Sequence, residues 1–139
     1  KDNNNSSELF KPEQEKPKKN PSKPKTEFIA PTLEQVKDYF RLQYPKLARM
    51  LFAVPNGGKR DAKTGARMKY EGAVRGVADL ILLIPKKGWA SLCIEMKTPK
   101  GTQSEHQRTW QTEAERYQNK YVICHSLQEF INEVNSYLQ

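Results

Sequence analysis

Little in this chain supports a disulfide framework, a zinc site or a membrane span. Its 139 residues include two cysteines and two histidines. Cys93 and Cys124 both lie in apolar runs expected to be buried strands, which favours free core thiols and a reducing cytoplasm over a disulfide. With His106 and His125 they lack the spacing of a zinc site. No apolar stretch has transmembrane length, and none resembles the core of a signal peptide.

Two common catalytic signatures are missing as well. Gly57-Gly58-Lys59 lacks the longer glycine spacing, and the Ser or Thr after lysine, that a P-loop needs. No Gly-x-Ser-x-Gly nucleophile elbow occurs. The length allows one domain, although the start at Lys1 leaves room for a leader or partner domain before it. We therefore expect one cytoplasmic domain, in a bacterial or phage-type context, whose chemistry rests on other residues.

Residues 1–30 differ in composition from the rest. They are rich in lysine, proline and asparagine and poor in apolar side chains. Too little surface can be buried there to offset the entropy of ordering, so we expect a flexible tether. A basic arm on DNA is the alternative, although several glutamates dilute its charge. The folded domain is expected to occupy residues 31–139.

The folded part carries alternating helix and strand signals. Thr32 and Gln35 have the spacing of a capping box that opens a helix, and Pro45 ends or kinks that helix. Ser126 and Glu129 predict a second capping box at the last helix. A middle helix and four strands are expected at 105–118, 51–54, 79–84, 90–97 and 121–124. The result is an α/β domain in the order α-β-β-β-α-β-α, with a central sheet flanked by helices.

The most informative pattern is the pair Glu95 and Lys97 at the end of an apolar run. Strand side chains alternate between faces, so these two should lie side by side on one face. Asp79 opens the preceding apolar run, and pairing of the two strands would bring its carboxylate to the same place. Two carboxylates suffice to hold Mg²⁺, and a lysine beside them suits phosphodiester hydrolysis. An ordinary ion pair on a half-exposed sheet is the alternative.

Four segments of the chain form a common pattern: Gly76-Val77-Ala78-Asp79-Leu80-Ile81-Leu82-Leu83, Leu92-Cys93-Ile94-Glu95-Met96-Lys97, Ser104-Glu105-His106-Gln107-Arg108-Thr109-Trp110 and Lys120-Tyr121-Val122-Ile123-Cys124. Together they resemble the VRR-NUC family of the PD-(D/E)xK nuclease superfamily, from about Asn56 to the C-terminus. Ala78 stands where that family usually has proline, a position that shapes the turn into the strand. The resemblance implies a restriction-endonuclease-like fold with a mixed sheet.

The resemblance also implies roles for individual residues. Asp79, Glu95 and the backbone carbonyl of Met96 would hold Mg²⁺ or Mn²⁺, with Lys97 at the attacking water. Gln107 would belong to the same site, although a capping box with Ser104 also explains it. It is expected on a buried helix stripe with Trp110, Ala114 and Tyr117. Glu34 would lie near the metal, although a solvated first-turn glutamate is the alternative.

Basic residues are concentrated before the catalytic strand, within a chain of net charge +8. We expect a long loop between the strands at 51–54 and 79–84, and its charge suits phosphate contacts. A merely soluble surface loop is the alternative. The residues expected on DNA are Asn56, Lys59, Arg60, Lys69 and Arg75.

We therefore expect a Mg²⁺- or Mn²⁺-dependent DNA endonuclease. As implied by the resemblance, it would act on branched DNA such as Holliday junctions, in DNA repair, as a homodimer. Two other functions stay open: a non-catalytic DNA-binding module of the same fold, and an RNA nuclease or nuclease subunit of a larger restriction, helicase or repair system.

Overall fold

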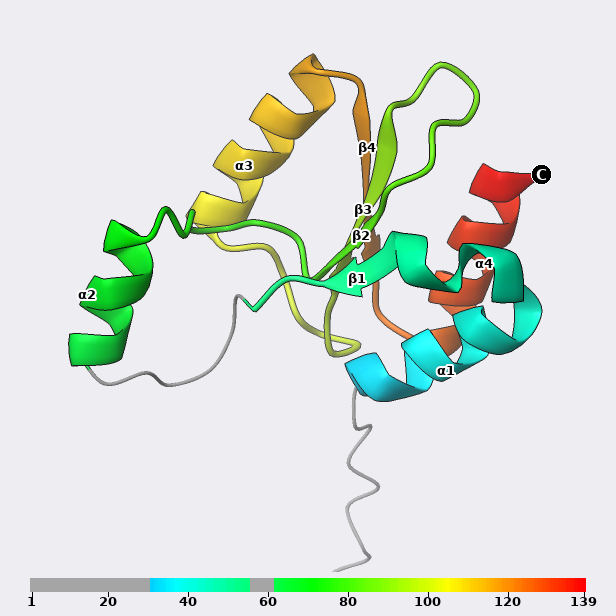
Figure 1. Cartoon of the computed structure of the whole chain (residues 1–139), viewed down its shortest axis with the longest axis horizontal. Coiled ribbons are helices and arrows are strands. Elements are labelled where there is room, and N and C mark those ends of the chain that lie inside the picture. Colours follow the sequence, from blue (N-terminus) through cyan, green and yellow to red (C-terminus); the bar gives the residue numbers. More distant parts are fainter. Residues whose placement is uncertain (1–30, 56–61) are drawn as a thin grey trace, which may run out of the picture.

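The computed structural model describes residues 31–55 and 62–139, so the expected tether at 1–30 lies outside the described residues. Figure 1 shows one α/β domain with helices on both sides of a sheet. No helix within the described ranges is long and apolar enough to cross a membrane. The elements are α1 (Leu33–Gln43), η1 (Pro45–Met50), β1 (Leu51–Ala53), α2 (Ala62–Tyr70), β2 (Leu80–Leu82), β3 (Ser91–Met96), α3 (Glu105–Arg116), β4 (Asn119–Cys124) and α4 (Leu127–Leu138).

The sheet is mixed, which confirms the predicted fold class. Its strand order is β1-β2-β3-β4. β2 pairs antiparallel with both β1 and β3, whereas β4 runs parallel to β3. The hairpin connection between β2 and β3 contains Lys87 and Gly88, both with positive φ. The parallel pair is connected through α3, so α3 returns the chain to the same end of the sheet.

Alternation along β3 separates two cores. Leu92 and Ile94 face the larger core, where α1 and α4 cover the sheet, and Cys124 lies in that core too. Cys93 faces the smaller core under α3, with Ala78 and Tyr121. Because Glu95 is two residues beyond Cys93, it emerges on the α3 face. The two cysteines therefore lie on opposite faces of the sheet, and both are free and buried.

The helix starts follow the sequence signals with one correction. Thr32 accepts a hydrogen bond from the N–H of Gln35, and the Gln35 side chain accepts from the N–H of Thr32, so the first capping box is complete. Ser126 accepts from the N–H of Glu129, but the Glu129 carboxylate accepts from the N–H of His125. The last helix therefore has half of the predicted box.

The expected long loop before β2 was wrong in part, because it contains the helix α2. Alanine, lysine, arginine and methionine in this segment favour a helix. Gly72, with φ of +95°, ends it: its N–H donates to the carbonyl of Lys69, and the N–H of Ala73 donates to the carbonyl of Met68. These two bonds form a Schellman motif, in which glycine adopts the left-handed conformation at low cost.

Candidate active site

The register of β2 and β3 brings the two predicted carboxylates together. Leu80 lies opposite Ile94, and continuing that pairing by one residue puts Asp79 opposite Glu95. The N–H of Met96 donates to Asp79 Oδ2 over 2.8 Å, which fixes the Asp79 carboxylate against the end of β3. The two strands thus position both acids through backbone pairing, as the alternation of the sequence predicted.

The carboxylate of Glu95 lies in an unusual environment. The residue is 2% exposed. Burial, and then the nearby charge of Asp79 and a side-chain hydrogen bond that the protonated acid shares with Asp79, raise the pKa of Glu95 to about 7, while Lys97 acts in the opposite direction. Within the described part of the chain, Glu95 Oε2 has no hydrogen-bond partner. A buried carboxylate oxygen without a partner is costly, so this atom suits a ligand absent from the protein alone.

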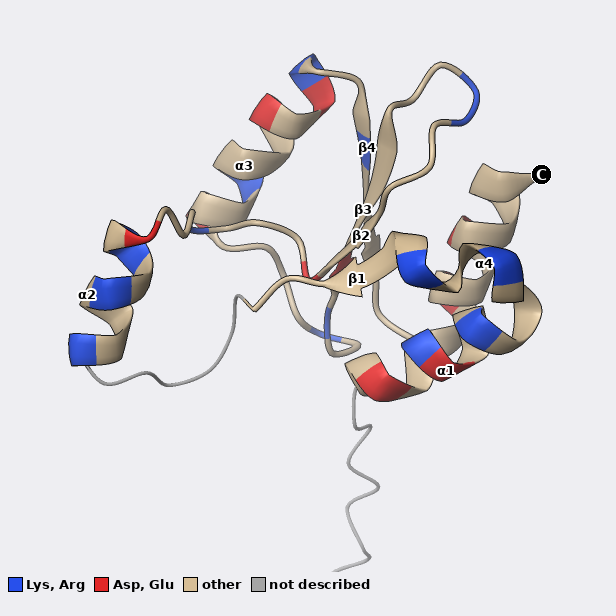
Figure 2. Ribbon diagram, viewed as in Figure 1, with Lys and Arg blue, Asp and Glu red and all other residues tan. Residues whose placement is uncertain are grey.

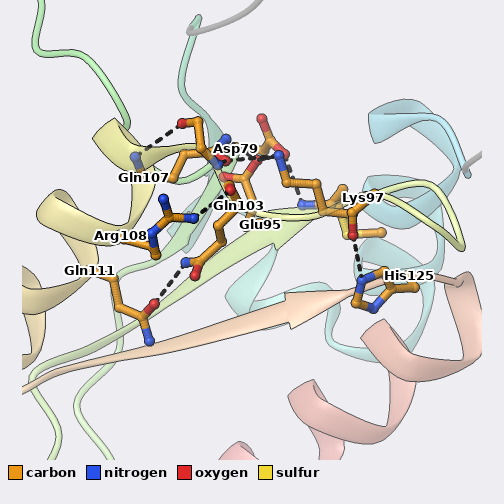
Figure 3. A network of polar contacts seen from close by, with 11 residues as sticks. Asp79, Glu95, Lys97, Gln103, Gln107, Arg108, Gln111 and His125 are labelled. Carbon is orange, nitrogen blue, oxygen red and sulfur yellow. Dashed lines mark hydrogen bonds and ion pairs between the residues drawn. The ribbon is translucent and has the colours of Figure 1, made fainter.

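Lys97 and Gln107 complete a closed polar triangle with Glu95 (Figure 3). Lys97 Nζ lies 3.4 Å from Glu95 Oε1 and donates to Gln107 Oε1 over 2.8 Å. Gln107 Nε2 donates to Glu95 Oε1 over 2.7 Å. The amide is oriented by this network, because its oxygen faces the ammonium and its nitrogen faces the carboxylate.

Gln107 is also the helix cap that the sequence offered as an alternative. Its Oε1 accepts from the N–H of Ser104 over 2.8 Å, and its own N–H donates to Ser104 Oγ. The capping box at the start of α3 therefore holds the amide where it meets Glu95 and Lys97. Ala114 and, partly, Trp110 are buried below it, whereas Tyr117 is 69% exposed and does not belong to the predicted stripe.

The loop from β3 to α3 is fastened at several points (Figure 3). His125 Nε2 lies 3.1 Å from the carbonyl oxygen of Gly101. Gln103 Nε2 donates to Gln111 Oε1 over 2.7 Å, and Arg108 donates to the carbonyl of Gln103 over 2.9 Å. These contacts fix the chain between Lys97 and α3, and the sequence analysis missed them because they join residues from three separate segments.

Tyr121 is a further polar group beside the acids that the sequence analysis assigned to a strand only. It is 7% exposed. Burial raises the pKa of Tyr121 to about 12; Gln103 lowers it, whereas the charges of Glu95 and Asp79 raise it further. The Tyr121 hydroxyl nevertheless has no hydrogen bond of normal geometry among the described residues. Its place in an apolar run indicated only a strand residue.

The other predicted site residues make no recorded side-chain contact with Asp79 or Glu95 among the described residues. Glu34 is exposed on the first turn of α1, and its side chain makes no hydrogen bond or ion pair with another described residue. Lys69 is exposed on α2, and Arg75 is exposed between α2 and β2. The predicted DNA contacts Asn56, Lys59 and Arg60 lie outside the described residues.

The donor set fits a hard divalent cation. No cluster of three or more His, Cys, Asp and Glu side chains occurs in residues 31–55 and 62–139. Mg²⁺ needs fewer, because it keeps several waters and binds through one or two carboxylates with substrate phosphate. Asp79 and Glu95 supply that pair, and the unpartnered Oε2 of Glu95 is the atom that such an ion would satisfy.

Comparisons with known proteins agree with this geometry. Residues 35–128 match the VRR-NUC domain family, a longer stretch than the motifs alone indicated. A solved structure described as a "VRR_NUC domain protein" superposes with a TM-score of 0.64 at 20% identity, covering 74% of this chain and 81% of the other. At that identity the likeness shows the fold. No protein of curated function matches the chain.

Proposed function

This chain belongs to the VRR-NUC domain family of nucleases, and from that premise we propose that it is a Mg²⁺- or Mn²⁺-dependent DNA endonuclease. The observation that carries the proposal is the buried Glu95 beside Asp79, with one carboxylate oxygen unpartnered among the described residues. A structural ion pair gives no reason to leave that oxygen without a partner.

Asp79, Glu95 and the backbone carbonyl of Met96 would hold the metal. When bound, the cation supplies an activated water and offsets charge on the scissile phosphate. The N–H of Met96 keeps Asp79 Oδ2 in place, which leaves its other oxygen for binding. Glu95 is oriented through Oε1 by Gln107, so Oε2 remains directed to the ligand.

Lys97 would act on the attacking water or on the charge that develops at phosphorus. Its ammonium has three donors, and the contacts with Gln107 and Glu95 occupy two of them. The third is left for substrate. Held by the half-buried amide of Gln107, Lys97 is preorganised, which is the condition under which one donor contributes most to catalysis.

The basic residues would bind the DNA backbone. Lys69 and Arg75 are exposed and near the start of β2 in the sequence, and with Asn56, Lys59 and Arg60 they would contact phosphates. Branched DNA such as a Holliday junction is the substrate we propose, cut by a homodimer, because one site per chain cuts one strand. Glu34 would approach the metal from α1 once substrate is bound.

The direct test is cleavage of linear, flap, splayed and four-way DNA of matched length with Mg²⁺ or Mn²⁺. We expect phosphodiester hydrolysis that is fastest on the branched forms. Equal rates on linear and branched DNA would contradict the substrate proposal, and the absence of hydrolysis of every DNA would contradict the activity.

A further inference from the structure

The helix α2 has a feature that the proposed chemistry does not use. We propose that α2 is an arm that binds unpaired nucleotides adjacent to the duplex part of the substrate, with Tyr70 stacking on a base and Lys63 and Arg67 on phosphates. This inference rests on the proposed function, because it specifies the DNA that the same site would receive.

One face of α2 combines aromatic and basic side chains. Lys63, Arg67 and Tyr70 follow one another by four and three residues, so they share one side of the helix. All three are exposed, Tyr70 to 93%. Gly65 and Met68 lie on the opposite side and are half-buried. Figure 2 shows the basic residues of α2 along a helix that stands apart from the sheet.

The arm is isolated from the domain along its length, and the segment that follows it is held against α3. α2 makes no extensive contact with another described helix or strand, and Figure 1 shows it standing away from both cores. Gly76, which follows it, packs so closely on α3 that an added side-chain carbon would lie 2.3 Å from the carbonyl oxygen of His106. His106 precedes Gln107, so the segment that connects α2 to β2 passes beside the candidate active site.

Charge favours a nucleic acid over a second copy of the chain as the occupant. A face on which Lys63 and Arg67 precede the exposed ring of Tyr70 attracts phosphate and repels an identical face. Arg67 Nε is 2.8 Å from Glu71 Oε1, but both side chains are exposed, and such a pair is weak enough to exchange for phosphate.

The aromatic ring identifies the form of the nucleic acid. Bases inside a duplex are stacked on one another and offer no free face, whereas an unpaired base can stack on a tyrosine. Base–aromatic stacking contributes without sequence preference. The arm therefore suits DNA in which a single strand leaves a duplex, as at an overhang, a flap or an open junction.

The experiment compares a short duplex with a thymidine extension against the same duplex with blunt ends. Binding is measured by fluorescence anisotropy in EDTA, so that no hydrolysis occurs. Tyr70→Ala should lose roughly 5- to 100-fold in affinity for the extended DNA and little for the blunt DNA, which matches the scale of one stacked base. Tyr70→Phe should retain the affinity of the parent. Tyr117→Ala, at another exposed tyrosine, is the matched control and should change neither.

Each other result overturns the inference. Equal loss on both DNAs would mean that Tyr70 supports general binding, and no loss on either would mean that the arm does not contact DNA. A reduced oligomeric mass of Tyr70→Ala with unchanged DNA binding would assign the face to a second copy. A parent chain that cleaves DNA while Tyr70→Ala keeps its preference contradicts only the arm. A parent that neither binds nor cleaves contradicts the proposed function itself.

Discussion

The N–H of Met96 donates to Asp79 Oδ2 over 2.8 Å, so the residue between Glu95 and Lys97 holds the second acid of the site. The backbone of β3 thus fixes the Asp79 carboxylate, and the Glu95 side chain of the same strand lies opposite it. Because this contact uses the main chain, no substitution at Met96 other than proline removes its donor. The spacing of the acids is therefore set by the sheet, and side-chain substitutions test their chemistry separately from their placement.

Lys97→Met tests the proposed catalytic amine. Loss of a preorganised donor should lower the single-turnover rate on a four-way junction by roughly 10²- to 10³-fold, with little change in melting temperature. Arginine should not restore the rate, because its planar fork stays charged and differs in shape from an ammonium. Lys100→Met, in the same loop but exposed, is the control. A Lys97→Met rate within a few-fold of the parent would remove Lys97 from the mechanism.

Substitutions at Ser104 and Gln107 distinguish helix capping from a role in catalysis. Ser104→Ala removes the hydroxyl cap and should cost about 1 kcal/mol of stability, but the contacts of Gln107 with Glu95 and Lys97 remain, so the rate per folded molecule should hold. Gln107→Ala removes both functions and should lower the rate as well. The measurement is thermal unfolding and single-turnover cleavage on both variants. Equal rates in the two variants would show that the amide acts only as a cap.

Glu95 should make the metal-free protein pH-sensitive. Its pKa rises from an ordinary 4.5 to about 7 in the folded state. Between these two pH values the folded protein keeps a proton on Glu95 that the unfolded chain has released. This contribution is complete below pH 4.5 and is lost as the pH rises through 7. The melting temperature in EDTA should therefore fall across that window by more in the parent than in Glu95→Gln. Identical pH profiles would contradict a raised pKa.

Metal binding should show the opposite trend with pH, because a bound cation displaces that proton. The affinity for Mn²⁺, measured by calorimetry, should increase up to about pH 7 and then level off. A pH-independent affinity would show that Glu95 is not a ligand.

The phosphate contacts predict a change in salt dependence. Lys69→Ala and Arg75→Ala should weaken binding to all DNA sequences about equally, and each should reduce the slope of log K against log salt by roughly one. Lys37→Ala, exposed on α1 at the other side of the sheet, should leave the slope unchanged. Unchanged slopes in all variants would leave the basic segment as an ordinary soluble surface.

Sequence patterns predicted the convergence of the acids because it depends on two local rules. Alternation puts Glu95 and Lys97 on one face, and antiparallel pairing of neighbouring runs brings Asp79 to them. The helix starts at Thr32 and Ser104 follow from short-range capping in the same way. These features need only residues close in sequence or adjacent strands.

The rest depends on contacts that no local pattern carries. Gln107 was predicted either to cap a helix or to belong to the site. Its side chain bonds to Ser104, Lys97 and Glu95 at once, because the loop after Lys97 places the first turn of α3 over Glu95. Tyr121 lies opposite Cys93, on the same face as Glu95, through the parallel pairing of β4, which joins distant segments. α2 was missed because its charged residues and Gly65 resembled a loop, although Gly72 is typical of a helix end.

Cleavage of a four-way junction with and without divalent metal tests most directly whether Asp79 and Glu95 hold a catalytic metal. We expect the parent to cut with Mg²⁺, to stop in EDTA and to resume when Mg²⁺ is added in excess. Asp79→Asn and Glu95→Gln should bind the junction with nearly the affinity of the parent, since the basic surface is untouched, and should not cut it. Full cleavage in EDTA, or by either folded variant, would contradict the proposal that these two carboxylates hold the catalytic metal.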